Sequence, residues 1–353
     1  MKILLVSPLP PPEGGIATWT KHFERYCHTS GIHLDIVNSA LTGKRSKKIN
    51  DKTSIKDEIK RTLYIFGRIR HFITKEKYDV IHFNSSCSKL GILRDALLIG
   101  FARRFKTPIV FECHCNLKSH IQSSLSLKAF NYISKRSKEV WVINQGSLEF
   151  AKAHTQKAKY MPNFIDEDAL VKEKEIREEI SKALFVGHVQ KDKGFLEITE
   201  IAAKLSNIEF VIAGPVSPEV SSVVIPQNMN MLGNVEHKNI KALMSDSDVF
   251  LFPSHAEGFS LVMLEAMASG LPIIATDVGA NKEMISCHGG IIVNVGDTSA
   301  MEDAFSKISL PEIRQEMSVY NIKRITECYT VEKVLHQIIE EYRKMGKECF
   351  QAN

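Results

Sequence analysis

The sequence lacks the features of a membrane-spanning or a secreted protein. It contains no run of about 20 consecutive apolar residues, the length that a transmembrane helix needs. Residues 1–6 lead directly into a proline-rich turn, without the apolar core and the cleavage site of a secretory signal. The seven cysteines are an odd number without regular spacing, which is typical of a reducing compartment. We therefore expect a cytoplasmic protein whose 353 residues provide two domains of ordinary size.

Three ligand-binding patterns are also absent. Cys113-His114-Cys115 is too tight to supply two ordinary zinc-ligand arms. The loop after the first expected strand carries Gly14-Gly15 but no G-x-G-x-x-G, which argues against a dinucleotide site. No aromatic platform or recognition motif for nucleic acid accompanies the basic residues. The order strand, Gly-rich loop and helix nevertheless favours an anion near Gly14-Gly15.

Acidic residues are scarce in the first half of the chain. Residues 1–163 carry 28 Lys and Arg against 12 Asp and Glu, whereas the remainder carries 18 against 29. Within the basic segment 41–77, apolar residues fall near helical spacing from Ile55 onward, which predicts an amphipathic helix. Such a charge distribution suits an anionic membrane surface, and a solvated face is the alternative.

Strand and helix patterns alternate through residues 1–160 and again through 183–300. This alternation predicts an α/β protein with two doubly wound, Rossmann-like domains that face each other across a cleft. The expected domains are residues 1–163 and 164–328, followed by a C-terminal helix at 329–353. We also expect a charged helix over 167–182.

The stretch 253–272, PSHAEGFSLVMLEAMASGLP, carries the strongest functional pattern. The apolar run 249–252 leads into it and predicts a buried parallel strand. A helical pattern then begins near Phe259-Ser260 and ends at Gly270. Because a helix start presents unpaired N–H groups and the positive end of the helix dipole, it favours a phosphate.

Two acidic residues lie around that helix start. Glu257 precedes it and Glu265 lies inside the helix. One carboxylate can meet a sugar hydroxyl beside the phosphates while the other meets a ribose. The stretch therefore predicts a nucleotide-sugar site, with the phosphates on the backbone N–H groups of Phe259, Ser260 and Leu261.

The order E-G-F-S-L-V-x-L-E-A-M-A-x-G-x-P resembles the retaining glycosyltransferases of family 4, which have the two-domain GT-B fold. The resemblance implies that the second domain holds the donor, with Glu265 on the ribose and Glu257 on the sugar ring. It implies that the helix at 329–353 packs back toward the first domain. It also implies retention of configuration, with the leaving phosphate helping to remove the acceptor proton.

Shorter motifs extend the donor site. Residues 185–194 resemble F-V-G-R-x-x-x-x-K-G, in which an Arg and a Lys bind the donor diphosphate. Lys193 matches, whereas His188 stands in place of the Arg. Positive charge is needed there because negative charge grows on the leaving diphosphate. Val235 is expected near the base through backbone groups, and Asn163 belongs to a step that resembles P-N-G-V-D, with Phe164 replacing Gly.

The resemblance places three residues of the first domain near the reaction. Gly14 and Gly15 match the Gly-Gly loop that faces the donor phosphates and the acceptor. His114 follows the expected strand 108–113 and stands where the family often has a histidine near the donor sugar and acceptor. Ligands gather at the carboxyl ends of parallel strands, which supports this placement. Together with Glu257 and Lys193, His114 completes the predicted catalytic group.

The resulting prediction is a retaining glycosyltransferase of the hexosyltransferase class. It moves a sugar from a nucleotide-diphosphate sugar, a UDP-sugar first of all, to a saccharide acceptor. The basic first half favours a lipid-linked acceptor and a peripheral position on the inner face of the membrane, as in polysaccharide or lipopolysaccharide O-antigen assembly. No cofactor is predicted. Because Asp246-Ser247-Asp248 precedes its strand, it lies at the wrong end for a diphosphate-bound metal, and the reaction is expected to be metal-independent.

Two other functions fit the same patterns. One is a GT-B nucleotide-sugar epimerase, which would convert the donor alone into a new epimer. The other is a non-catalytic nucleotide-sugar-binding protein, which the replacement of Arg by His188 suggests. Measurable transfer by the unaltered protein excludes the second, whereas a His188→Arg change that raised turnover from zero would favour it.

Overall fold

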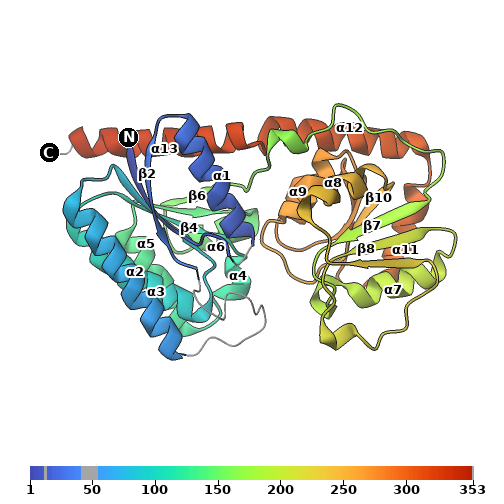
Figure 1. The fold of residues 1–353 in the computed structure, drawn as a ribbon, viewed down its shortest axis with the longest axis horizontal. Helices are drawn as coiled ribbons and strands as arrows, with labels where there is room; N and C mark the ends of the chain where they lie inside the picture. The colour runs from blue at the N-terminus through green and yellow to red at the C-terminus, as the bar shows by residue number, and fades with distance from the viewer. Residues whose placement is uncertain (12–13, 41–54, 352–353) are drawn as a thin grey trace. The chain divides into compact units, whose positions relative to one another are not determined.

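The computed structural model describes residues 1–11, 14–40 and 55–351. They form two compact units (Figure 1): unit 1 comprises Met1–Asn163 with Val331–Asn353, and unit 2 comprises Phe164–Thr330. Each unit is built on a six-stranded parallel sheet with helices on both faces, as predicted for the α/β class. The loop at 42–54, which belongs to the basic segment 41–77 and which we expected to meet lipid head groups, lies outside the described residues. Within the described ranges, no helix combines the length and the apolar character needed to cross a membrane.

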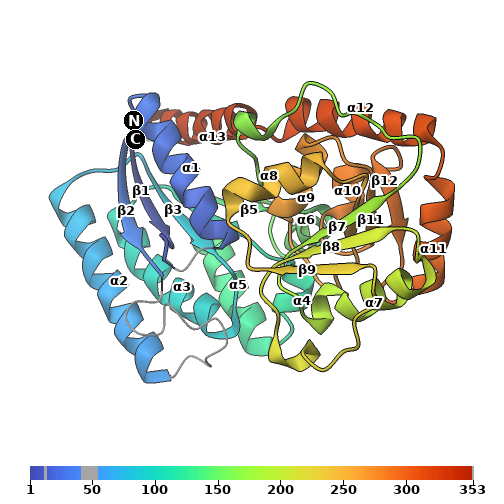
Figure 2. The ribbon, with the colours of Figure 1, turned by 45° about the vertical axis from the view of Figure 1, so that its right-hand side comes forward.

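Unit 1 has the strand order β2-β1-β3-β4-β5-β6. Its strands are β1 Lys2–Ser7, β2 His33–Asn38, β3 Val80–Ser85, β4 Ile109–Cys113, β5 Glu139–Val142 and β6 Ala158–Tyr160. Its helices are α1 Gly15–Thr29, α2 Ile55–Lys75, α3 Lys89–Ala102, α4 Leu117–His120, α5 Ser124–Arg136, α6 Gln145–Lys152 and α13 Val331–Gln351, with a 3₁₀ turn at Arg103–Phe105. Helices α2, α3 and α5 pack on one face of the sheet, and α1 and α13 pack on the other (Figures 1 and 2).

The C-terminal helix α13 is part of unit 1 although the chain passes through unit 2 before reaching it. Its sequence predicts one apolar stripe, and the structure buries all the residues of that stripe: Val331, Val334, Leu335, Ile338, Ile339 and Tyr342. Tyr342 stacks on Trp141 of β5, with ring centroids 5.5 Å apart. The hydrophobic stripe therefore fixes this helix against the unit-1 sheet.

Unit 2 has the strand order β12-β11-β10-β7-β8-β9. Its strands are β7 Lys182–Val186, β8 Glu209–Ala213, β9 Met229–Gly233, β10 Val249–Phe252, β11 Ile273–Thr276 and β12 Gly290–Val293. Its helices are α7 Phe195–Lys204, α8 His237–Ser245, α9 Leu261–Ala268, α10 Asn281–Ile285, α11 Thr298–Lys307 and α12 Pro311–Cys328, with 3₁₀ turns at Glu167–Ala169, Lys191–Lys193 and Pro218–Val220. Helices α7 and α11 share one hydrophobic core, whereas α9 packs with α12.

The strand orders place a topological switch point in each sheet. The chain leaves β7 toward β8 on one side and later adds β10 on the other side, so the loops after β7 and β10 diverge from adjacent strands. In unit 1 the corresponding neighbours are β1 and β3. Ligands of open α/β sheets bind at the carboxyl ends of strands at such points. In unit 2 these ends carry both the 187–194 and the 253–260 segments.

The prediction of a charged helix over 167–182 is wrong. After a single 3₁₀ turn at Glu167–Ala169 the chain runs without regular structure to β7. Glu and Lys favour helices in isolation, but long-range hydrogen bonds decide this segment. Val171 N–H donates to Ala268 O at 3.0 Å, and the buried Lys174 Nζ donates to Met244 O at 3.3 Å and Ser245 O at 2.9 Å, at the carboxyl end of α8.

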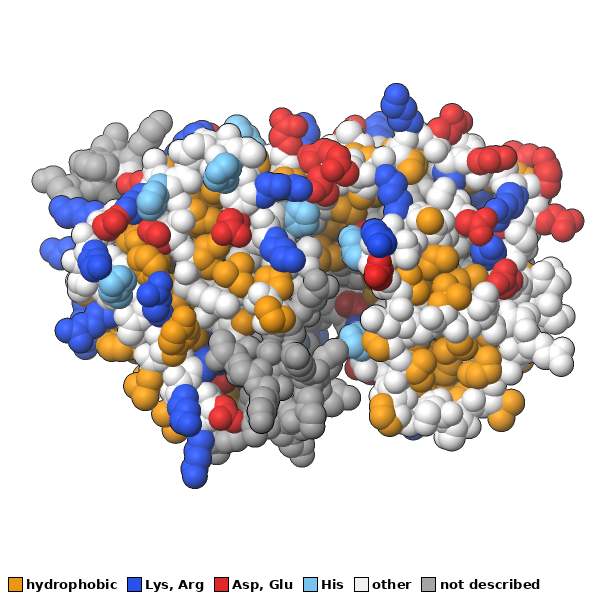
Figure 3. Space-filling view, viewed as in Figure 1, with side chains coloured by type: hydrophobic (Ala, Val, Ile, Leu, Met, Phe, Trp, Pro, Cys, Tyr) orange, Lys and Arg blue, Asp and Glu red, His pale blue; other side chains and the backbone are white. Residues whose placement is uncertain are grey.

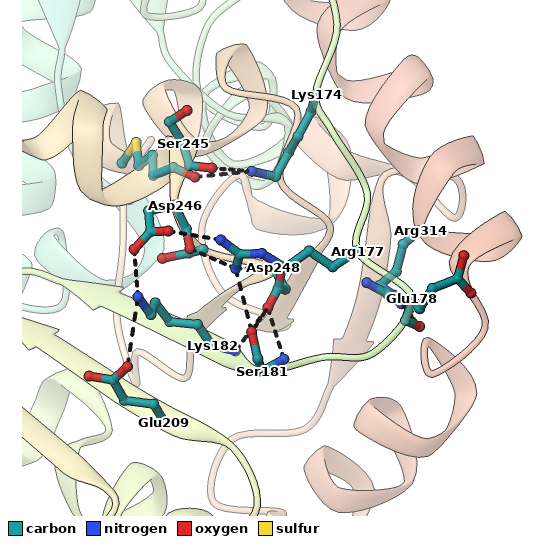
Figure 4. Close-up of polar contacts among 12 residues, drawn as sticks. Lys174, Arg177, Glu178, Ser181, Lys182, Glu209, Ser245, Asp246, Asp248 and Arg314 are labelled. Atoms are coloured by element: carbon teal, nitrogen blue, oxygen red, sulfur yellow. Dashed lines mark hydrogen bonds and ion pairs between the residues drawn. The ribbon is translucent and has the colours of Figure 1, made fainter.

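Asp248 ties the start of β7 to the start of β10 (Figure 4). Its Oδ2 accepts from Ser181 N–H, Ser181 Oγ and Lys182 N–H, each at 2.9 Å, and Arg177 Nη1 lies 3.1 Å from its Oδ1. Asp246 also contacts Arg177, at 2.8 Å, but its side chain is 56% exposed while that of Asp248 is 4% exposed. Both aspartates therefore act at the amino edge of the sheet, opposite the loops described above.

Replacing Asp248 by Ala should lower the free energy of unfolding by about 2–3 kcal/mol, because two backbone N–H groups lose their acceptor. Asp246→Ala is the matched control and should cost less than about 1 kcal/mol, since its ion pairs are exposed. Urea unfolding of both variants measures the difference. Equal losses would contradict the structural role assigned to Asp248.

Candidate functional site

The loops after β7 and β10 are held together at the carboxyl edge of the unit-2 sheet. His255 N–H donates to Asp192 O at 2.8 Å, and Ser254 Oγ lies 3.4 Å from the same oxygen. Gly194 adopts a φ of +76°, and a Cβ there would lie 2.2 Å from Pro253 O. The two loops can approach this closely because residue 194 has no side chain.

A second glycine holds the 253–258 loop from the side of β11. Gly279 has a φ of +55°, and a Cβ at this position would lie 2.6 Å from the carbonyl oxygens of both Glu257 and Gly258. Ala280 N–H donates to Gly258 O at 3.0 Å. The loop that carries Glu257 is therefore fixed by close backbone packing on two sides.

This packing brings Lys193 and Glu257 together. Lys193 Nζ lies 2.5 Å from Glu257 Oε1, and Ser254 Oγ donates to the same oxygen at 2.9 Å. Ser254 is itself held by Thr276 Oγ1, which donates to its carbonyl oxygen at 2.5 Å. The side chains of Lys193 and Glu257 are 26% and 14% exposed. An ammonium group and a carboxylate thus meet at the edge, where one can bind a phosphate and the other a hydroxyl.

Helix α9 begins where the sequence predicts, next to this ion pair. Its first residue is Leu261, and the side chain of the N-cap Ser260 accepts from Met263 N–H at 3.4 Å. Phe259 is 5% exposed and packs edge-on against Tyr329, with centroids 5.5 Å apart. A buried aromatic anchor and a capped first turn hold the helix dipole at one position beside Glu257.

Glu265 lies one turn inside α9 and contacts a histidine that the sequence analysis missed. His237 Nε2 is 2.9 Å from Glu265 Oε1, and the Glu265 side chain is 22% exposed. His237 opens α8, directly after the loop that contains Val235. Polar residues that follow neighbouring parallel strands converge at one edge, and this rule applied to β9 would have found His237.

Two further histidines lie at this edge. His188 follows β7 and is exposed, in the position where the resembling motif has Arg. His255 was also missed; its Nε2 lies 2.7 Å from Glu197 Oε1 of α7. A neutral imidazole donates one hydrogen bond where the guanidinium group of an arginine donates several, so His188 offers fewer donors than the resembling motif has at this position.

The remaining predicted site residues, Gly14, Gly15, His114 and Asn163, belong to unit 1. Gly14 is the N-cap of α1 and Gly15 is its first residue. A Cβ at Gly14 would meet nothing within 4 Å, so packing within unit 1 does not require glycine there. Residues 12 and 13 of the same loop lie outside the described part of the chain.

His114 follows β4 as predicted, but its side chain is only 3% exposed. Its backbone N–H donates to Ser85 O at 2.8 Å, which extends the ladder between β3 and β4. Burial lowers the pKa of His114, opposed by the nearby Glu112 carboxyl and by a hydrogen bond with Asn163. Asn163 is thus placed beside His114 in unit 1. The ring of His114 acts as a neutral group at physiological pH.

The geometry of unit 2 agrees with comparisons to known proteins. Residues 166–324 match the family described as glycosyl transferases group 1. They belong to that family. The matched segment contains Lys193, Glu257 and Glu265, that is, the loops and the helix start described above.

Two relatives and one solved structure extend the likeness over the chain. The 2-deoxystreptamine N-acetyl-D-glucosaminyltransferase of Niallia circulans is 22% identical over 84% of this chain and 88% of its own length. The capsular polysaccharide biosynthesis glycosyltransferase CapM of Staphylococcus aureus is 28% identical over 46% of each chain. The structure of Anabaena HepE in complex with UDP and glucose aligns over 98% of this chain and 100% of its own, with a TM-score of 0.73 and 16% identity. The fold is GT-B, as the resemblance implied.

Gly279→Ala should displace the Glu257–Gly258 backbone and so weaken the binding of any ligand that depends on this loop, the predicted nucleotide sugar first of all, at least about tenfold, a cost of about 1.4 kcal/mol. Gly296→Ala is the control, because Gly296 also has a positive φ, of +78°, but its Cβ would meet only Glu197 Oε1, at 4.0 Å, which is an ordinary contact. Both variants carry the conformational strain of an L-residue, and only Gly279→Ala adds the clash. Thermal-shift titration with UDP-sugars compares them; equal affinities would contradict the role of this packing.

Proposed function

We propose that this protein is a retaining glycosyltransferase that uses a UDP-sugar and transfers the sugar to a saccharide acceptor. The observation that carries the proposal is the Lys193–Glu257 pair at the capped start of α9. In the proposed complex, Lys193 leaves Glu257 for the donor diphosphate. Glu257 is then available to a hydroxyl of the sugar ring, and the first-turn N–H groups of α9 meet the phosphates.

The ribose is assigned to Glu265, in the next turn of α9. Its partly exposed carboxylate accepts from His237 when no ligand is bound, and ribose hydroxyls can replace that contact. His188 can donate a hydrogen bond to the diphosphate. Val235 lies in the loop before His237. In a retaining reaction assisted by the leaving phosphate, no protein group has to act as the base. The carboxylates then bind the substrate and do not attack it, unlike those of glycosidases.

The proposed reaction uses no metal ion. Asp246 and Asp248 are engaged at the amino edge of the unit-2 sheet, with Arg177, Ser181 and Lys182. Positive charge for the leaving diphosphate comes from Lys193 and from the dipole of α9. In the proposed complex these groups lie at the carboxyl edge of the unit-2 sheet, beside the diphosphate that leaves when the glycosidic bond breaks.

Replacing Glu265 by Gln should weaken donor binding at least about tenfold, because an amide makes a poorer acceptor for the ribose hydroxyls than a carboxylate. A UDP-sugar at about 100 times its dissociation constant stabilises the folded protein by roughly 2.7 kcal/mol, so thermal-shift titration can rank donors and variants. Glu302→Gln, on α11 of the same unit, is the control and should keep the affinity of the unaltered protein. Unchanged affinity in Glu265→Gln would remove the basis for the proposal.

We further propose a lipid-linked acceptor and a position at the cytoplasmic face of an anionic membrane, as part of surface-polysaccharide assembly. The exposed side of α2 carries Ile59, Leu63 and Tyr64, which are 55%, 64% and 54% exposed. Figure 3 shows Lys and Arg side chains beside hydrophobic ones over the part of unit 1 that α2 covers. An exposed helix face that combines apolar side chains with cations suits the head-group region of a bilayer.

A basic pocket in unit 1 supports the same proposal. It has a volume of about 220 Å³ and lies at the amino ends of β4 and β5. Its charged lining residues are all cations: Arg103, Lys106, Lys135, Arg136, Lys138 and Lys157. Burial and the nearby charges of Lys138 and Arg103 lower the pKa of Lys157. An anionic head group in the pocket would relieve this repulsion.

The double change Ile59→Ser and Leu63→Ser should reduce binding to phosphatidylglycerol vesicles, because each methylene withdrawn from the membrane costs about 0.8 kcal/mol. Stability should change little, since both side chains are exposed. The control is Leu196→Ser with Val224→Ser, which removes exposed apolar side chains from unit 2. Vesicle sedimentation measures binding. Failure of the unaltered protein to prefer phosphatidylglycerol over phosphatidylcholine would overturn the membrane proposal and leave the donor site untouched.

A further inference from the structure

Unit 1 contains a chain of buried polar side chains that ends at His114. His82 and Glu112 are fully buried, His114 is 3% exposed and Tyr342 is 1% exposed. The Tyr342 hydroxyl makes a short hydrogen bond to His82 Nδ1. His82 Nε2 lies 3.0 Å from Glu112 Oε2, and His114 Nε2 lies 3.4 Å from Glu112 Oε1. One carboxyl group therefore contacts both imidazole rings.

Aromatic rings enclose this chain of polar groups. Trp19 of α1 meets the rings of His82 and His114 edge-on, with centroids 5.7 Å away in both cases. Trp141 packs against His82 and stacks on Tyr342. Polar groups in such surroundings are costly unless they are fully hydrogen-bonded. Apolar residues of similar volume would fill the space at a lower cost in free energy. The presence of polar groups there therefore calls for a function.

The contacts of Glu112 are close but not aligned. Both of its carboxyl oxygens and the facing Nε2 atoms of His82 and His114 lack a partner with hydrogen-bond geometry. A small rotation of the His114 ring would close the 3.4 Å contact to an ordinary bond. Hydrogen bonds of this kind are often long in a free enzyme and tighten when the substrate binds.

The side chains around Glu112 favour neutral states. Burial raises the pKa of Glu112 to about 7 and lowers that of His82 to about 3. Burial also lowers the pKa of His114 and raises that of Tyr342, so Tyr342 keeps its proton. The other titratable group of the cluster, Cys27 of α1, is a neutral thiol because burial raises its pKa to about 12. The carboxyl of Glu112 is therefore the group that changes charge near neutral pH.

Neutral groups in this order can carry hydrogen bonds in one direction. The hydroxyl of Tyr342 donates to His82 Nδ1, which leaves the proton of that ring on Nε2, facing Glu112. Protonated Glu112 accepts from His82 with Oε2 and donates from Oε1 to His114 Nε2. His114 then carries its own proton on Nδ1. When Glu112 ionises, Oε1 accepts instead, and the proton of His114 moves to Nε2.

We propose that Glu112 is a positioning residue which, supported by His82 and Tyr342, sets the tautomer of His114 and so decides whether His114 Nδ1 donates to or accepts from a substrate oxygen. The proposal rests on the proposed function and on the family resemblance, which implies that His114 stands near the sugar and the acceptor. It goes further by making the proton on Nδ1 depend on a carboxyl group that touches no substrate. Donation from Nδ1 belongs to the protonated state of Glu112, below about pH 7.

The test observes the tautomer directly, by long-range ¹H–¹⁵N NMR of protein labelled at histidine, with the His114 signals assigned from a His114→Asn variant. In the unaltered protein the proton of His114 should move from Nδ1 to Nε2 as the pH rises through about 7. Glu112→Gln should keep it on Nδ1 throughout, because an amide can donate but cannot ionise. Glu139→Gln is the matched control, since Glu139 of β5 bonds Trp141 and Lys159 instead, and it should titrate like the unaltered protein.

Tyr342→Phe is a second variant, for the case that Glu112→Gln does not fold. It removes only the hydroxyl and keeps the ring that stacks on Trp141. It should move the pH at which the His114 tautomer changes, because His82 is no longer oriented. A tautomer that does not change with pH in the unaltered protein, or that changes identically in Glu112→Gln, overturns the proposal. An unchanged midpoint in Tyr342→Phe does the same for the role of Tyr342.

Kinetics then separate this inference from the proposed function. Release of UDP from the UDP-sugar that gives the largest thermal shift should show a kcat/KM that falls above about pH 7. Glu112→Gln should lose that fall, and Glu112→Leu should lower kcat/KM on the order of a hundredfold. Absence of UDP release from the unaltered protein at every pH contradicts the proposed function alone, since the NMR result stands without it. UDP release with the same pH profile in Glu112→Gln contradicts only the inference.

Discussion

The approach of backbone to backbone at the carboxyl edge of the unit-2 sheet is the constraint on which the site depends. Gly194 and Gly279 stand on either side of the loop that carries Glu257, each in a left-handed conformation and each against a carbonyl oxygen. With a side chain at either position, the loop would have to move. The contact between Lys193 and Glu257 and the start of α9 both follow from that placement, because these groups come directly after the packed backbone.

The polar groups of the two units differ in exposure and in charge. In unit 2 the polar groups are partly exposed and charged, with an ammonium and a carboxylate in contact at a helix start. Such groups can exchange partners with a charged ligand at small cost, since water and counter-charges are available. In unit 1 the polar groups around Glu112 are sealed and held neutral by burial. Buried neutral groups keep their hydrogen-bond partners instead of exchanging them with a ligand. Such groups are suited to holding the His114 ring in one orientation.

Much of the fold could be predicted from the sequence, because the apolar strands and the stripe of α13 are periodic and uninterrupted. The start of α9 was predicted within two residues for the same reason: Ser260 is a strong N-cap residue, and an apolar helical pattern follows it. The helix predicted over 167–182 does not form, because hydrogen bonds with Met244, Ser245 and Ala268, which are distant in sequence, outweigh the helix propensity of the segment. Local propensity carries no information about such partners.

The same limit applies to the site. Lys193, Glu257 and Glu265 could be found because they lie inside recognisable motifs. His237 could have been found only from its place after β9, whereas His255 could not, since its importance comes from pairing with Glu197 across the fold. His114 was placed at the correct strand end, but its burial depends on Trp19 and Asn163, which the local sequence does not reveal.

The assignment of α13 to unit 1 affects the order in which the protein can mature during synthesis. Residues 1–163 are made before unit 2, yet the faces of Trp141 and His82 that Tyr342 covers stay open until Tyr342 has been made. Unit 2 is continuous in sequence and can fold while the last helix is still inside the exit tunnel. Unit 1, most of which is made before unit 2, is therefore the later of the two to close its core, and during that interval it exposes a hydrophobic face that chaperones can recognise.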